Sequence, residues 1–116
     1  MKFYHYPKCS SCRKAKKWLE SNDIEVEAIH LVDETPDSET LQALWEKSGL
    51  PLKKFFNTSG GSYRALDLKN TYGDYTDEER LGLLADDGML IKRPILELDD
   101  TVLVGFKESA YEDALG

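Results

Sequence analysis

Apolar positions in the first third of the chain change from the spacing of a strand to the spacing of a helix and back. Phe3 to Tyr6 form a short, mostly aromatic run that predicts a strand, and Pro7 marks the turn after it. The next apolar residues recur every three or four positions, which predicts a helix with one buried face: Cys12, Ala15, Trp18 and Leu19. The branched residues of Ile24 to Val32 predict a second strand. Because a helix joins them, we expect the two strands to be parallel in a βαβ unit.

The middle of the chain, from about residue 36 to residue 86, has the pattern of several helices. Thr35 is the expected cap of the first of them, and Gly49 is its expected end. Asn57 to Ser62 are rich in glycine and small polar residues, which predicts a flexible loop. Thr76 to Glu79 match a capping box and predict the start of another helix.

The last third predicts a hairpin and a final helix. Met89 to Leu98 and Thr101 to Phe106 form two apolar strands around the turn residues Asp99 and Asp100. Pro94 interrupts the first of these strands and marks an edge, a bulge or a cis bond. Glu108 to Leu115 predict the terminal helix. This order of elements is that of an α/β, thioredoxin-like (glutaredoxin-like) fold, with a mixed four-stranded sheet and an inserted helical subdomain.

Length and charge narrow the class of protein. The chain has 116 residues, of which 41% are hydrophobic, so residues 1–116 are expected to form a single domain. Its net charge of −7 argues against direct binding of nucleic acid, whose phosphates would repel such a surface. No apolar run approaches the length of a membrane span or of a signal-peptide core. We therefore expect a cytoplasmic protein without a membrane partner.

The two cysteines, Cys9 and Cys12, lie between the first strand and the first helix. A helix start stabilises a thiolate, and five of the fifteen basic residues surround the pair: Lys8, Arg13, Lys14, Lys16 and Lys17. This pattern favours a redox-active dithiol, in which Cys12 resolves a mixed disulfide formed on Cys9. Cytosolic dithiols are usually catalytic or sensing, which supports the same interpretation.

Three other interpretations of the cysteine pair stay open. A structural disulfide would close a very small ring and so contribute little stability. Zinc would need about four ligands, and the remaining candidates are His5, His30 and scattered carboxylates. Two inert buried thiols would leave the basic flank unexplained. We expect no metal and no other cofactor.

The sequence resembles the arsenate reductase (ArsC) and Spx family, and within it the short, Spx-like members from Gram-positive bacteria. Three segments carry the resemblance: Tyr6-Pro7-Lys8-Cys9-Ser10-Ser11-Cys12-Arg13-Lys14-Ala15, Leu90-Ile91-Lys92-Arg93-Pro94-Ile95 and Val104-Gly105-Phe106. The resemblance implies that Cys9 is the nucleophile and that Pro94 is a cis proline beside it. It also implies that Arg93 faces the thiolate and any bound oxyanion, and that Cys9 and Cys12 form a reversible disulfide.

The resemblance also bears on activity and partners. Glutathione-coupled arsenate reductases carry two further arginines, and the positions that align here are Asn57 and Phe106-Lys107. We therefore expect a thiol-disulfide oxidoreductase with thioredoxin, glutaredoxin or glutathione as its thiol partner, and true arsenate reduction is less favoured. The alternative is a Spx-like redox-sensing regulator that binds the C-terminal domain of the RNA polymerase alpha subunit. Tyrosines such as Tyr4, Tyr6, Tyr63 and Tyr72 are expected in the core and receive no role.

Overall fold

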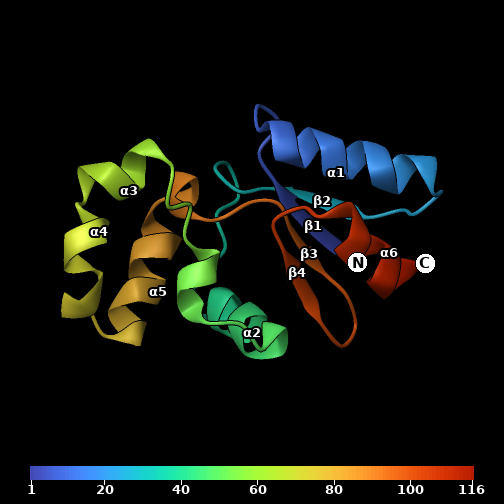
Figure 1. Ribbon diagram of the computed structural model, residues 1–116. Coiled ribbons are helices and arrows are strands. Elements are labelled where there is room, and N and C mark those ends of the chain that lie inside the picture. Colours follow the sequence, from blue (N-terminus) through green and yellow to red (C-terminus); the bar gives the residue numbers. More distant parts are fainter.

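A four-stranded mixed sheet forms the centre of the molecule (Figure 1), and the computed structural model describes all residues from 1 to 116. The strands are β1 (Lys2–His5), β2 (Glu27–His30), β3 (Ile95–Glu97) and β4 (Val102–Val104), in the order β2-β1-β3-β4. β1 and β2 are parallel, whereas β3 runs antiparallel to both β1 and β4. The predicted α/β, thioredoxin-like fold with a mixed sheet is confirmed.

Side chains alternate between the two faces of the sheet and so divide the core. On one face, α1 (Ser10–Ser21) and α6 (Glu108–Leu115) pack against the sheet. The buried residues of this face form one cluster: Phe3, Ala15, Leu19, Leu96 and Tyr111. A neighbouring residue in each strand, Tyr4 after Phe3 in β1 and Ile95 before Leu96 in β3, belongs to the larger cluster on the other face, as the period of two in a strand requires.

The larger cluster holds fifteen buried residues and joins the sheet to the helices between β2 and β3. These elements are α2 (Ser38–Ser48), η1 (Leu52–Phe55), α3 (Gly61–Ala65), α4 (Leu68–Thr71), η2 (Tyr72–Asp74), α5 (Asp77–Asp86) and η3 (Gly88–Leu90). Figure 1 shows α3, α4 and α5 gathered at the end of the molecule away from α6. No helix combines the length and the apolar character that crossing a membrane would require.

Several local predictions are confirmed. The Thr76 hydroxyl accepts from the Glu79 backbone N–H at 3.1 Å, and the Glu79 carboxylate accepts from the Thr76 N–H at 2.9 Å, which completes the capping box. Gly49 follows α2 in the left-handed conformation, with φ of 68°. The hairpin around Asp99 and Asp100 is formed by β3 and β4.

Three predicted elements have wrong boundaries. The strands predicted over residues 24–32 and 89–98 are shorter, because Ile24 to Val26 form no sheet pairs and Met89 lies in η3. The predicted loop Asn57 to Ser62 is only partly a loop: it closes as a turn, with the Gly60 N–H donating to the Asn57 carbonyl at 3.2 Å, and α3 begins at Gly61. Tertiary packing overrides the local pattern at all three places.

Thr35 is not the cap of α2. Asp37 caps it instead, accepting from the Thr40 N–H at 2.8 Å. The Thr35 hydroxyl donates to the Leu31 carbonyl at 2.6 Å and so closes the turn that leaves β2. Both residues are good caps by type, and the contact of Thr35 with the preceding strand decides between them.

Candidate thiol redox site

Cys9 is the N-cap residue of α1. Its backbone is extended, with φ of −85° and ψ of 124°, and its N–H donates to the Tyr6 carbonyl at 2.9 Å across the Pro7-Lys8 turn. Its sulfur accepts from the Cys12 backbone N–H at 3.5 Å. The side chain of Cys9 thus takes the place that a serine or aspartate oxygen takes in an ordinary cap, where a negative charge is stabilised by the helix N-terminus.

The side chain of Cys12, unlike that of Cys9, points into the core. Its side chain is 1% exposed and lies on the buried face of α1 with Ala15 and Leu19. Its sulfur accepts from the Tyr6 backbone N–H at 3.5 Å. Burial raises the pKa of Cys12 to about 12, since this effect outweighs the hydrogen bond from Tyr6, and the neighbouring Cys9 acts in the same direction as burial.

Arg93 comes to the site from the segment before β3, and its peptide bond to Pro94 is cis. One guanidinium nitrogen, Nη1, donates to the Met89 carbonyl at 3.2 Å, and the guanidinium carbon lies 5.2 Å from the centre of the Tyr6 ring. The Nε atom is buried and has no hydrogen-bond partner. The guanidinium is thus fixed by η3 and by an aromatic face, and it keeps one buried donor free.

The balance of forces at Cys9 favours the thiolate. Burial would raise its pKa, but the Cys12 backbone N–H, the Cys12 thiol and the Arg93 guanidinium act against burial, and the Cys9 pKa lies below its ordinary value. The pKa values of the two cysteines therefore shift in opposite directions: that of the half-buried Cys9 is lowered, and that of the buried Cys12 is raised.

The basic residues near the cysteines contribute differently from what the sequence suggested. All five are exposed: Lys8, Arg13, Lys14, Lys16 and Lys17. Water and salt screen exposed charges, and the positive charge that acts on Cys9 belongs to Arg93, more than eighty positions further along the chain.

The arrangement of histidines and carboxylates offers no metal site. No three side chains of the histidine, cysteine, aspartate and glutamate types converge. His30 uses Nδ1 to accept from the Val32 and Asp33 N–H groups, at 3.1 Å each. The pKa of His5 is lowered by burial first, then by Lys16 and His30. Both cysteines are free thiols.

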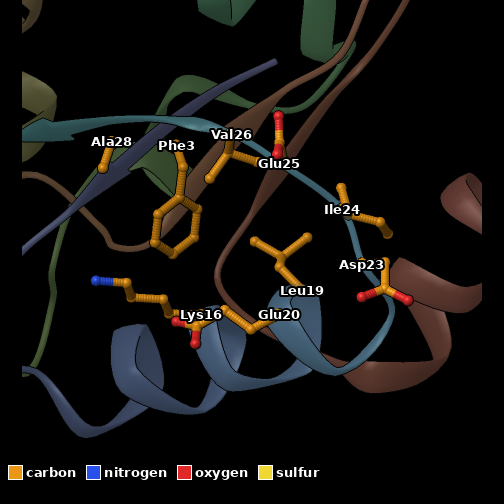
Figure 2. A pocket seen from close by; sticks show the side chains of 9 residues that line it. All are labelled: Phe3, Lys16, Leu19, Glu20, Asp23, Ile24, Glu25, Val26 and Ala28. Atoms are coloured by element: carbon orange, nitrogen blue, oxygen red, sulfur yellow. The ribbon is translucent and has the colours of Figure 1, made fainter.

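Two cavities adjoin α1, and only the smaller one reaches a cysteine. It has a volume of about 150 Å³ and is lined by His5, Pro7, Cys12, Arg13 and Lys16. A larger groove of about 610 Å³ runs between α1 and the segment that enters β2 (Figure 2). Phe3 and Leu19 form its apolar floor, and neither cysteine lines it. The groove is therefore separate from the thiol chemistry.

Tyr6 and Met89 are site residues that the sequence analysis did not identify. Tyr6 contributes its N–H to Cys12, its carbonyl to Cys9 and its ring to Arg93. Its place directly before Pro7, at the end of the strand that feeds the cysteine motif, is the only signal in the sequence for this role. Met89 acts through its backbone carbonyl, which no side-chain pattern reveals.

Comparison with known proteins bears on the same residues. The sequence matches the ArsC family over residues 4–114, a range that includes both cysteines, Arg93 and Pro94. The chain belongs to the ArsC family. Among solved structures, an ArsC-family-related protein from Bacteroides fragilis superposes with a TM-score of 0.92 at 49% identity, covering 96% of this chain and 93% of that one.

The relatives of this chain include a protein named as a regulator and a protein named as an enzyme. The protein YusI of Bacillus subtilis is 56% identical over 96% of this chain and 94% of its own length. The regulatory protein MgsR of the same organism is 34% identical over 90% of this chain and 81% of its own. An arsenate reductase of Neisseria meningitidis is 30% identical over 90% of this chain and 89% of its own. ArsC-family members thus include both enzymes and regulators.

Proposed function

We propose that this ArsC-family protein is a thiol-disulfide oxidoreductase in which Cys9 is the nucleophile and Cys12 the resolving cysteine. The observation that carries the proposal is the geometry of the first turn of α1, where the half-buried Cys9 sulfur accepts from the Cys12 backbone N–H and the Cys12 side chain is buried. A thiolate is the attacking species in disulfide exchange, so the half-buried Cys9, with its lowered pKa, is the group suited to attack.

The proposed cycle conserves electrons at each step. The Cys9 thiolate attacks one sulfur of a substrate disulfide, a Cys9–substrate disulfide forms, and the other substrate thiolate leaves. Cys12 then loses its proton and attacks the Cys9 sulfur, which releases the second substrate thiol and leaves the Cys9–Cys12 disulfide. An external dithiol or two monothiols reduce this disulfide and are themselves oxidised. Thioredoxin, glutaredoxin and glutathione are reductants of the required class.

Arg93 serves the first step in this scheme. Its guanidinium stabilises the Cys9 thiolate before attack. Its positive charge beside Cys9 also favours an anionic group of the substrate near the same sulfur. Pro94, whose bond to Arg93 is cis, has a structural role at the site in this proposal.

A trapping experiment tests the assignment of roles. Cys12→Ser should accumulate a stable mixed disulfide with a small disulfide substrate, detected as an added mass on Cys9 by intact-protein and peptide mass spectrometry. Cys9→Ser should accumulate none, because the buried Cys12 has a raised pKa. Equal trapping by the two variants would contradict the proposal.

A second function is favoured by the relationship to MgsR. In this alternative the Cys9–Cys12 disulfide is a sensor, and its formation changes the affinity of the protein for the C-terminal domain of the RNA polymerase alpha subunit. Binding of that purified domain to the oxidised and the reduced protein separates the two functions. Binding in one redox state, without turnover of small disulfides, would favour the sensor.

Arsenate reduction has less support at this site. Arg93 is the arginine that acts on Cys9, whereas Arg80 donates to the Tyr72 carbonyl at 2.8 Å and pairs with Asp77 at 2.8 Å. Asn57 supplies no positive charge at the position where glutathione-coupled reductases carry an arginine. A divalent oxyanion would therefore be poorly neutralised, and we propose disulfides as the substrates.

A further inference from the structure

A pocket among the inserted helices, separate from the cysteines, gathers positive charge. It has a volume of about 460 Å³ and lies at the end of the molecule that holds α3 and α4 (Figure 1). Three of its six lining residues are cations and three are not: Lys53, Arg64 and Lys69, with Thr58, Tyr63 and Asp67. No cysteine lines this pocket, and Arg93 does not line it either, so it has no part in the proposed redox cycle.

The three cations of the pocket have no acidic partner. None of the three ion pairs in the protein involves Lys53, Arg64 or Lys69. Asp67 lines the same pocket, but its carboxylate accepts from the Asn70 side chain at 2.9 Å and forms no ion pair. Acidic residues outnumber basic ones in this chain by 22 to 15, so unpaired cations around one pocket differ from its average surface. The pocket therefore has an excess of two positive charges.

Two of the cations are held by neighbours that leave their charge unneutralised. The Lys53 ammonium lies 5.4 Å from the centre of the Tyr72 ring. Nη1 of Arg64 donates to the Ser59 carbonyl at 3.4 Å. An aromatic face and a carbonyl oxygen attract a cation without cancelling its charge. The remaining donors of the Arg64 guanidinium make no hydrogen bond to the protein and are available to a ligand.

The glycine-rich turn beside the pocket places Thr58 and the Ser59 carbonyl. The Gly60 N–H donates to the Asn57 carbonyl at 3.2 Å, and the Ser59 hydroxyl donates to Asn57 Oδ1 at 3.4 Å. The Asn57 N–H donates in turn to the Leu90 carbonyl at 2.7 Å, which attaches the turn to η3. These hydrogen bonds hold this side of the pocket in place.

Tyr63 brings to the pocket a hydroxyl that has no partner in the protein. The residue is 6% exposed, and its ring belongs to the larger buried cluster. Its oxygen makes no hydrogen bond, and it is not among the side-chain polar atoms that are sealed from solvent without a partner. The small exposed part of Tyr63 therefore includes the hydroxyl, at the pocket that the residue lines. Packing uses only the ring and leaves the hydroxyl as a donor for a ligand.

We propose that this pocket binds the phosphate group of a small phosphomonoester. Such a group carries a charge of about −1.5 to −2 near neutral pH, which complements the excess of two positive charges. The planar fork of Arg64 and the point charges of the two lysines suit phosphate oxygens, and the Tyr63 hydroxyl can donate to another. A volume of about 460 Å³ leaves room for the organic part of the ligand, since small-molecule sites span roughly 300–1,000 Å³.

Titration of the nitrogen-15-labelled, full-length protein with phenyl phosphate tests the proposal, with backbone amide signals followed by NMR. The buffer contains about 0.15 M sodium chloride, which screens general attraction between exposed charges. We expect saturable shifts at the amides of residues 53–69, with a Kd of about 1 mM or below. Phenol, which lacks the phosphate, and dimethyl phosphate, which is a monoanion, should both bind more weakly.

Single substitutions assign the binding to the pocket. Lys53→Gln should weaken binding of phenyl phosphate roughly twofold to fivefold, because it removes one screened charge. Tyr63→Phe should weaken it roughly twofold to tenfold, because it removes a hydrogen-bond donor and keeps the ring. Lys54→Gln is the matched control: Lys54 is the exposed neighbour of Lys53 in η1 but does not line the pocket, so the affinity should not change. Thermal unfolding of each variant confirms that it is folded.

Three results would overturn the proposal. The first is the absence of saturable shifts at residues 53–69. The second is a set of shifts confined to residues 8–17, where five other exposed cations lie, which would place the anion beside the cysteines. The third is equal weakening by Lys53→Gln and Lys54→Gln, which would reduce the effect to general surface charge. None of these results bears on the redox function, which the trapping experiment tests separately.

Discussion

The backbone nitrogen of Cys12 lies 3.5 Å from the sulfur of Cys9, while the sulfur of Cys12 points into the core. Cys12 thus lowers the Cys9 pKa first through its backbone N–H and second through its side chain. Substitutions of the Cys12 side chain that retain a small polar group should therefore preserve the state of Cys9.

The first prediction concerns the Cys12→Ser variant. Its Cys9 should be alkylated by iodoacetamide with a pH midpoint below that of an ordinary thiol, because the backbone N–H and a polar side chain at position 12 both remain. The measurement is the alkylation rate as a function of pH, followed by mass spectrometry. A midpoint at the value of a free cysteine would show that the cap does not stabilise the thiolate.

The second prediction concerns Arg93→Ala. Removal of the guanidinium should raise the Cys9 pKa, move the alkylation midpoint to higher pH and slow alkylation at neutral pH roughly threefold to tenfold after allowance for solvent screening. Lys14→Ala, which removes an exposed positive charge from α1, is the matched control and should change the rate little. Equal effects of the two variants would mean that only the general charge of the region matters.

The third prediction concerns stability at high pH. Because the pKa of Cys12 is raised from 9.0 to about 12 in the folded protein, Cys12 contributes full stability below 9.0 and the contribution is lost as the pH rises, since the unfolded chain ionises first. Urea unfolding of the reduced protein should show a free energy of unfolding that starts to fall as the pH rises above 9.0. In Cys12→Ser this fall should be smaller. An equally steep fall in both proteins would place its origin elsewhere.

The fourth prediction concerns the junction of β2 and η3. A Cβ atom at Gly88 would overlap the Leu31 carbonyl, the same oxygen that accepts from the Thr35 hydroxyl. Gly88→Ala should therefore destabilise the protein by about 1–3 kcal/mol in chemical denaturation. Gly82→Ala, inside α5 with open space around it, should instead stabilise it by about 0.5–1 kcal/mol. The same sign for both variants would contradict the close approach.

The elements that could be predicted from the sequence are those defined by local chemistry. The capping box at Thr76 and the helix end at Gly49 depend on residues within one turn, and the predicted contacts are present. Thr35 could not be distinguished from Asp37 as a cap, because the deciding contact is with the Leu31 carbonyl of an earlier segment. The start of the strand predicted at Met89 was wrong for a similar reason, since Met89 lies in η3, which connects α5 to the sheet.

The candidate site also combines features that adjacent residues determine with features that depend on residues distant in the sequence. The cysteine motif and its position at the start of a helix follow from a few adjacent residues. The source of the positive charge that acts on Cys9 could not be predicted in this way. Lysines are close to Cys9 in the sequence, but the charge that lowers the Cys9 pKa belongs to Arg93, which is distant in the sequence.

The exposed basic residues around the cysteines affect how the protein attracts charged molecules over a distance. Neither the four basic residues of α1 nor Lys8 before it forms an ion pair, although the chain carries 22 acidic side chains and a net charge of −7. The segment that carries the half-buried Cys9 therefore presents unpaired positive charge on a chain of negative net charge. Such charge attracts acidic groups toward Cys9 over a distance that shrinks as salt is added, so the rate of encounter with an acidic substrate should fall with ionic strength.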